Sequence, residues 1–284
     1  MQLRRSIVGA GAALALVPAA TAMAATIQGG AGNERLRGTA AADIIDGNAG
    51  NDFILGRAGD DQLTGGLGND RIFGGPGNDT INGLQGNDRL EGGMGDDTVV
   101  GDANGTGDLT SLDRIGGGPG NDTLRGGDSR DRIAGGSGDD TANGENGNDI
   151  MSGGSGNDTQ DGGPGNDIIY ANAGQDTTYG GDGNDRLWAL ARADVQPGAH
   201  GETDTAGDTL DGGNGNDVFR TRDGEVDKIT CGPGQDRALL DTVDVITDAT
   251  ADNPNGSCEK VIRRAPKAHD HDANTEDAQS SRPH

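Results

Sequence analysis

Aliphatic side chains recur every nine residues along most of this chain, and glycine, asparagine and aspartate fill the positions between them. The stretch Gly65–Val100 reads GGLGNDRIF, GGPGNDTIN, GLQGNDRLE and GGMGDDTVV, with aspartate sixth and an aliphatic residue eighth. Eight such nonads run through Gly29–Val100, eight more through Gly117–Trp188, and one further copy is Gly212–Arg220. A fixed period of this kind predicts a solenoid in which each repeat packs mainly on its neighbours.

Each nonad divides into a turn and a strand. The first six residues are rich in glycine and asparagine, which tolerate positive φ, so they predict a turn. The last three, such as Arg71-Ile72-Phe73, predict a very short strand whose middle side chain faces inward. Two nonads would then complete one coil, with strands of successive coils parallel and 18 residues apart. The expected fold class is all-β, a parallel β-solenoid.

The sixth-position aspartates predict a cation site. One inward apolar side chain per nonad leaves a core too thin to offset the entropy of ordering the turns. Stacking the coils would place Asp52, Asp70 and Asp88 in one column and Asp61, Asp79 and Asp97 in the other. Bare carboxylates in a column repel each other, whereas Ca²⁺, which takes six to eight oxygen ligands, would reverse that interaction.

The pattern GGxGxDxUx in Gly65–Phe73, Gly74–Asn82 and Gly117–Arg125 resembles the hemolysin-type (RTX) calcium-binding nonapeptide repeat. The resemblance spans roughly residues 29–220 and implies a right-handed parallel β-roll. It also implies Ca²⁺ between turns, held by glycine-loop carbonyls and the sixth-position aspartates. In this sequence those candidate ligands are Asp52, Asp61, Asp70, Asp79, Asp88, Asp97, Asp122, Asp131, Asp140, Asp149, Asp158, Asp167, Asp176, Asp185 and Asp217.

Composition and charge agree with a calcium-dependent repeat. The chain has 284 residues with 55 Gly, 47 acidic residues and 2% aromatics, which without the period would indicate disorder. The formal charge is −25, and it becomes −27 once residues 1–24, with two arginines and no acid, are removed. Such a chain repels nucleic acid and anionic membrane and attracts divalent cations.

Residues 1–24 predict a secretory signal peptide and a secreted, extracellular protein. Arg4 and Arg5 precede the apolar run Ile7–Val17, and Ala22-Met23-Ala24 is an A-x-A cleavage site. A membrane anchor is the weaker alternative, because the apolar run is too short to span a bilayer.

Two insertions interrupt the roll predicted for residues 25–220. Residues 101–116 and 189–211 exceed one nonad and are expected to form surface loops, with binding loops as the alternative. Trp188 is expected to cover the core edge, and carbohydrate stacking is the alternative for this residue. Gln160 and Thr178 take inward positions, so this half is expected to be less stable, or more metal-dependent, than residues 65–100.

The character of the chain changes from Thr221. Residues 221–262 resemble the C-terminal end of secreted actinobacterial calcium-binding repeat proteins, and they predict a β cap closed by a disulfide. Cys231 and Cys258 are the only cysteines, and an even count in an exported chain favours a bridge over two metal-binding thiols. Residues 263–284 have no apolar pattern and predict a disordered tail.

No catalytic motif was found, so the sequence predicts a protein that is not an enzyme. The four histidines fall outside any H-E-x-x-H pattern, and no serine completes G-x-S-x-G. The predicted function is a secreted calcium-binding repeat protein that folds as Ca²⁺ binds. The alternatives are a calcium-dependent surface adhesin or matrix protein, with a cell-surface or glycan partner, and an accessory for secretion or folding of a hydrolase or toxin.

Overall fold

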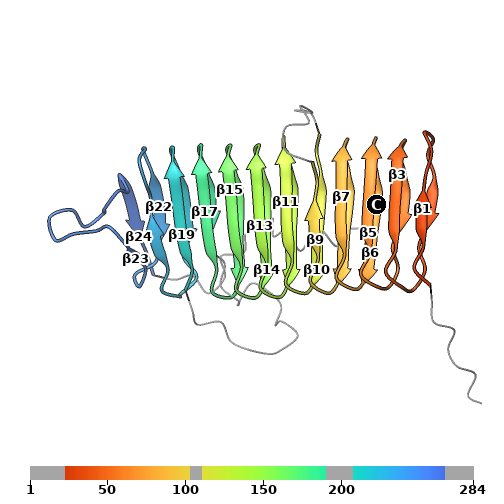
Figure 1. The fold of residues 1–284 in the computed structure, drawn as a ribbon. Helices are drawn as coiled ribbons and strands as arrows, with labels where there is room; N and C mark the ends of the chain where they lie inside the picture. Colours follow the sequence, from red (N-terminus) through yellow and green to blue (C-terminus); the bar gives the residue numbers. More distant parts are fainter. Residues whose placement is uncertain (1–22, 103–110, 190–206, 266–284) are drawn as a thin grey trace, which may run out of the picture.

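Strands 18 residues apart in the sequence lie side by side, and together they build two long parallel sheets (Figure 1). The computed structural model describes residues 23–102, 111–189 and 207–265, and within these ranges every regular element is a strand. The predicted all-β parallel solenoid is therefore confirmed. Most of the predicted signal peptide and of the C-terminal tail lie outside the described residues.

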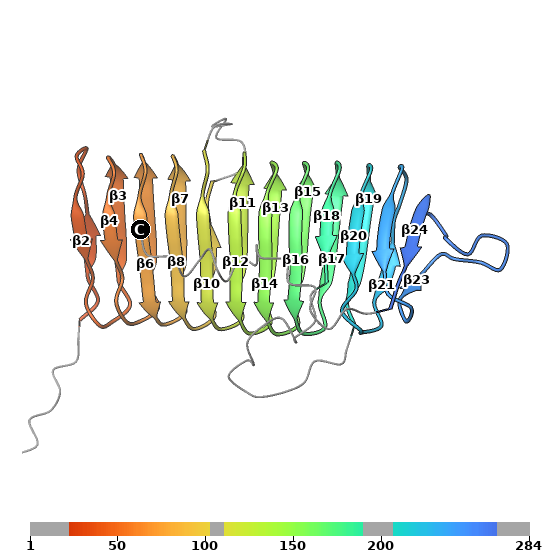
Figure 2. The same cartoon turned by 180° about the vertical axis from the view of Figure 1, so that it is seen from behind.

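The chain alternates between the sheets at every turn, so odd-numbered strands form one sheet and even-numbered strands form the other. The odd sheet contains β1 (Thr26–Gln28), β3 (Ile44–Ala49), β5 (Gln62–Leu67), β7 (Thr80–Gln85), β9 (Thr98–Val100), β11 (Thr123–Asp128), β13 (Thr141–Asn146), β15 (Thr159–Pro164), β17 (Thr177–Asp182), β19 (Thr209–Asn214), β21 (Lys228–Thr230) and β23 (Val245–Ile246). The even sheet, in order along the axis in Figure 2, contains β2 (Arg35–Arg37), β4 (Phe53–Leu55), β6 (Arg71–Pro76), β8 (Arg89–Met94), β10 (Arg114–Pro119), β12 (Arg132–Ser137), β14 (Ile150–Ser155), β16 (Ile168–Ala173), β18 (Arg186–Trp188), β20 (Val218–Thr221), β22 (Arg237–Leu240) and β24 (Lys260–Arg263).

Most strands are longer than the three residues that the pattern predicted. Strand β6, for example, is six residues long because it continues from the end of one nonad into the start of the next. Gly75 pairs with Gly93 and Pro76 with Met94, so the parallel ladder continues across the glycine pair. The expectation of very short strands was wrong because glycine-rich segments were assigned wholly to the turn.

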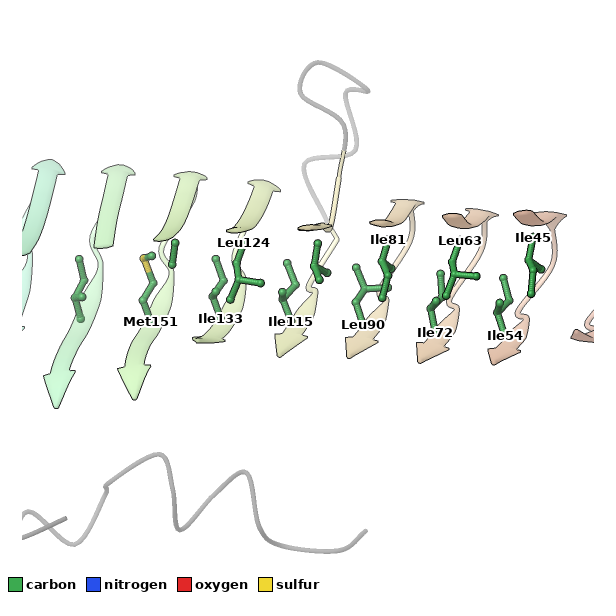
Figure 3. Packing of buried hydrophobic residues seen from close by; sticks show 13 residues of the cluster. Ile45, Ile54, Leu63, Ile72, Ile81, Leu90, Ile115, Leu124, Ile133 and Met151 are labelled. Carbon is green, nitrogen blue, oxygen red and sulfur yellow. The ribbon is translucent and has the colours of Figure 1, made fainter. Parts of the chain in front are cut away.

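The eighth-position side chains form the core, as predicted. Ile54, Leu63, Ile72 and Ile81 are fully buried, and Figure 3 shows labelled members of this set lying between the two sheets. The apolar core falls into two clusters, one ending at Ile169 and the other containing Leu187 and residues beyond it. Gln160 and Thr178 are buried on the adjacent rungs β15 and β17, where the inward position is polar.

Both insertions enter a turn without disturbing the register of the roll. Strand β10 pairs with β8 before it and β12 after it, and β19 pairs with β17 and β21. The parts of the insertions that lie in residues 103–110 and 190–206 are outside the described residues.

Trp188 does not cover the core edge, contrary to the sequence-based expectation. Leu187 takes the inward position of β18 and is fully buried, so its neighbour Trp188 points to the outer face. There its ring contacts Tyr170 edge-on at a centroid distance of 4.8 Å. Trp188 points outward because it is the ninth residue of its nonad, whereas the eighth residue is the one that faces the core.

The chain beyond Thr221 extends the same two sheets. Strand β22 pairs with β20 and β24, and β23 pairs with β21, so this segment continues the coiling as far as Arg263. Cys231 and Cys258 form the predicted disulfide, with 5.2 Å between their Cα atoms. The described residues form no helix that is long and apolar enough to cross a membrane.

Candidate metal sites along the turns

Each sixth-position aspartate links two coils through one carboxylate oxygen. Oδ1 of Asp70 accepts a hydrogen bond from the backbone N–H of Asp52 at 2.7 Å, and the N–H of Asp70 donates to Oδ1 of Asp88 at 2.7 Å. The same bond repeats from coil to coil along both edges of the roll. These hydrogen bonds hold the carboxylates in line.

The bonds define two columns, one at each edge. The first contains Glu34, Asp52, Asp70, Asp88, Asp113, Asp131, Asp149, Asp167, Asp185, Asp217, Asp236 and Glu259. The second contains Asp43, Asp61, Asp79, Asp97, Asp122, Asp140, Asp158, Asp176, Asp208, Asp227 and Asp244.

The fifth-position residues form a parallel ladder that runs in the opposite sense. Oδ1 of Asn51 accepts from the N–H of Asn69, and Oδ1 of Asn69 accepts from the N–H of Asn87, each at 2.8 Å. Aspartate serves equally at this position, because Oδ1 of Asp60 accepts from the N–H of Asn78 at 2.9 Å. The Asn-Asp pair of each nonad therefore ties its turn to the coil before it and to the coil after it.

The second carboxylate oxygen of most column aspartates has no hydrogen-bond donor. In Asp70, Asp79, Asp88 and most other column members within the described chain, Oδ2 is buried and accepts no hydrogen bond. A buried carboxylate oxygen without a donor is strongly unfavourable. Each of these oxygens therefore lies where a cation or a proton would lower the free energy.

Glycine at the first position of the nonad leaves the space beside that oxygen. A Cβ on Gly65 would lie 2.3 Å from Oδ2 of Asp70 and 2.8 Å from the carbonyl oxygen of Gly83 in the next coil. The corresponding distances at Gly74 are 2.2 Å to Oδ2 of Asp79 and 2.5 Å to the carbonyl of Gly92. A carboxylate oxygen and a backbone carbonyl thus converge on each of these glycines.

Burial raises the pKa of most aspartate carboxyl groups in the two columns. It raises the pKa of Asp88 to about 7, of Asp149 to about 8 and of Asp113 to about 9, although hydrogen bonds from the preceding coil act in the opposite direction. Neighbouring carboxylates in the column, such as Asp70 beside Asp88, raise it further.

Asp43, near the open end of the second column, is different. Burial acts to raise the pKa of its carboxyl group, but hydrogen bonds from the N–H groups of Thr39 and Ala25 lower it below the ordinary value. Both its oxygens therefore have donors, whereas Oδ2 of interior members such as Asp70 and Asp79 has none.

The donor set fits calcium better than a transition metal. Within the described chain no group of three or more His, Cys, Asp or Glu side chains is arranged to hold an ion. Carboxylate and carbonyl oxygens are nevertheless the ligands that hard cations take. A site here would combine one or two column carboxylates with carbonyls of the glycine turns.

All fifteen aspartates predicted as calcium ligands lie in the two columns and are at most 2% exposed. Their role as ligands remains a prediction. The structure adds column members that the prediction omitted: the aspartates Asp43, Asp113, Asp208, Asp227, Asp236 and Asp244, and the glutamates Glu34 and Glu259 at the ends of the first column.

Two of the omitted aspartates, Asp113 and Asp208, lie near the ends of the two insertions, and the sequence around them resembles part of a nonad. Asp113 and Asp208 begin the segments Asp-Arg-Ile and Asp-Thr-Leu, which match the second half of a nonad. They were omitted because the insertions place them 25 and 32 residues from their column neighbours instead of 18.

Comparison with protein families agrees with this geometry. The family model for the RTX calcium-binding nonapeptide repeat (4 copies) matches residues 28–63, 64–99, 113–142, 125–160, 152–187 and 203–225, together more than half of the chain. No curated protein matches the sequence. The unmatched stretches between these segments coincide with parts of the two insertions.

Proposed function

Because the chain belongs to the RTX calcium-binding nonapeptide repeat family, we propose that it is a secreted, non-enzymatic protein whose roll folds as calcium binds between its turns. The observation that supports this most directly is the row of buried Oδ2 atoms that accept no hydrogen bond. A roll with these carboxylates charged and no cation nearby would be destabilised by desolvation and by repulsion along each column.

The ligands proposed for calcium come from two successive coils. Oδ2 of Asp70 and the carbonyl of Gly83 represent the arrangement, which recurs with Asp79 and Gly92. In the folded roll, Oδ1 of each aspartate accepts a hydrogen bond from the N–H of the preceding coil, and this bond fixes the orientation of Oδ2. The bound ion supplies positive charge to the desolvated oxygens.

Coupled folding and binding follows from the same arrangement. Each proposed site needs oxygens from two coils, so the unfolded chain does not contain it, and ion binding stabilises the folded state by mass action. Extracellular calcium modules have dissociation constants of about 10⁻⁴–10⁻³ M. A chain with such sites would remain unfolded at low cytosolic calcium and fold after export. The Cys231–Cys258 disulfide supports an oxidising destination.

Circular dichroism during a calcium titration tests this proposal. The β signal should grow with Ca²⁺ concentration and reach a plateau, while Mg²⁺ at the same concentration should produce much less, since it demands octahedral geometry and keeps its waters. A β signal that is already complete in metal-free buffer at neutral pH would contradict coupled folding.

A pair of charge-matched variants tests the ligand assignment. Asp70→Asn/Asp88→Asn replaces the Oδ2 atoms with amide donors, and it should lower the number of calcium ions bound per chain. Asp60→Asn/Asp96→Asn removes the same charge from exposed fifth positions, where Oδ1 remains an acceptor, and should leave that number unchanged. Equal stoichiometry in the two variants by equilibrium dialysis would refute the assignment.

A further inference from the structure

The outer face of the even sheet carries a row of arginines on neighbouring rungs. Arg71 pairs with Arg89, Arg89 with Arg114, and Arg114 with Arg132 as direct Cα partners on β6, β8, β10 and β12. All four take the seventh position of the nonad, next to the buried eighth residue, so they point away from the core. Figure 2 shows the strands β6, β8, β10 and β12 side by side in this sheet. We call these four residues the arginine row.

Positive charge is concentrated on this sheet of an acidic protein. The described strands of the even sheet contain eleven Arg or Lys residues and a single acid, Glu91. The described strands of the odd sheet contain only Arg125 and Lys228 as cations, and several acids such as Asp161 and Asp211. Since the formal charge of the chain is −25, this asymmetry forms a basic face on an acidic molecule.

The arginine row does not stabilise the fold. Like charges directly opposite each other on adjacent strands are destabilising. Among the described residues, the ion pair from Arg89 to Glu91, at 3.1 Å, is the only one that a member of the row makes. Exposed threonines, such as Thr80 and Thr98 on the odd sheet, occupy the equivalent positions without repulsion. Repulsion among the four arginines therefore destabilises the free protein, and an anionic partner bound along the row would remove that repulsion.

Aromatic rings flank the row on the same face. The partly exposed rings of Phe53 and Phe73 contact each other with centroids 5.7 Å apart. The Trp188 ring is also partly exposed, and it packs at 4.8 Å against Tyr170, which is buried and only supports it. The Arg220 guanidinium lies over the Trp188 ring at 4.9 Å. Aromatic rings and flat guanidinium groups offer surfaces on which the apolar faces of sugar rings stack.

We propose that this face binds a linear acidic polysaccharide, with carboxylates of the polymer paired to the arginine row. The rungs repeat at ~4.8 Å along a straight axis, so a flat sheet presents one guanidinium per rung to an extended polymer. Guanidinium groups pair with carboxylates in bidentate fashion. This surface is separate from the proposed calcium sites on the turns and requires only that the roll be folded.

Other polyanions fit the face less well. A membrane would need fully exposed apolar anchors, whereas the aromatic rings of this face, such as Phe53 and Phe73, are only partly exposed. The large apolar residues of the described chain that are exposed, such as Ile44, Tyr179 and Val245, lie outside the seventh and ninth positions of the even strands. Nucleic acid carries a phosphate about every 3.4 Å on each strand, and this charge density is opposed by the net charge of −25. A polysaccharide with sparser carboxylates is repelled less.

The test measures binding of fluorescent hyaluronan oligosaccharides to the full chain in saturating calcium. Arg71→Gln/Arg89→Gln/Arg114→Gln should weaken binding at least about tenfold, the summed effect of three exposed ion pairs. The matched control Arg57→Gln/Arg125→Gln/Lys228→Gln removes the same charge away from the row and should change affinity less than about twofold. Glu91→Gln should tighten binding, because it removes the single acid from the face.

Four outcomes would overturn the proposal: an unchanged affinity in the row variant, an equal loss in the control, equal binding of neutral dextran, or tighter binding of single-stranded DNA than of hyaluronan. Circular dichroism of every variant in calcium shows that the roll is folded. A protein that folds without calcium would refute the proposed function and leave this binding test valid.

Discussion

Glycine has two distinct roles within one nonad. At Gly65 the backbone φ is ordinary, and glycine is required because a Cβ would collide with Oδ2 of Asp70. At Gly66 and Gly68 the φ angles are 117° and 119°, which disfavour other residues. The first role concerns the candidate metal site and the second concerns the turn, so substitutions at these positions should have different effects.

Gly65→Ala should remove one candidate calcium site. The added methyl would lie 2.3 Å from Oδ2 of Asp70 and 2.8 Å from the carbonyl of Gly83, and so displace the oxygens that converge there. We expect fewer calcium ions per chain by isothermal titration calorimetry and a higher calcium concentration at half-folding. Leu67→Ala, at an exposed position of the same nonad, is the control. Equal stoichiometry in the two variants would show that the glycine serves packing alone.

Arg57→Gly should stabilise the roll by about 0.5–1 kcal/mol, because Arg57 is exposed and has a φ of 94° at the second position, where nonads such as those of Gly66, Gly75 and Gly93 have glycine. Urea denaturation in saturating calcium measures the change. Gln85→Gly, at an exposed third position without positive φ, should instead destabilise by a similar amount. Two changes of the same sign would be inconsistent with this explanation.

At the scale of the strand, the nine-residue period was enough to predict which residues face the core and how the strands pair. The inward residues, the parallel pairing and the 18-residue register follow from the nonad alone, and the structure confirms them. Strand length was underestimated because glycine pairs predict a turn, whereas in the structure the β-ladder continues through them, as at Gly75 and Gly93. Asp113 and Asp208 were omitted because a period cannot be counted through an insertion, whereas the stacked coils restore it.

Gln160→Leu/Thr178→Val should stabilise the second half of the roll by about 1–3 kcal/mol. These side chains separate the two apolar clusters, their mutual contact is a long 3.4 Å hydrogen bond, and Nε2 of Gln160 is buried without a partner. The melting temperature in calcium should rise, and half-folding should need less calcium. Gln62→Leu, at an exposed position of β5, should change neither quantity. No rise in the double variant would show that the polar rungs do not weaken the core.

The whole molecule carries two dense carboxylate columns, and their protonation should control its metal-free stability. Folding raises the pKa of Asp88 to about 7, of Asp149 to about 8 and of Asp113 to about 9, mainly through burial. Because the unfolded values are about 4, the folded state binds more protons between these limits. Stability from these groups is therefore fully present below about pH 4 and is lost as pH rises through about 7 to 9.

Protons should thus substitute for calcium. Protein stripped of metal over a chelating resin should gain β structure as the pH falls from 8 towards 5, with circular dichroism and the urea midpoint as readouts. Calcium affinity should fall over the same range, because each ion must displace protons from the column carboxylates. Asp60→Asn/Asp96→Asn, which leaves the buried columns intact, should show the same pH dependence. Metal-free stability that instead rose between pH 5 and 8 would mean that these carboxylates are not desolvated in the folded roll, and the physical basis for calcium-dependent folding would be lost.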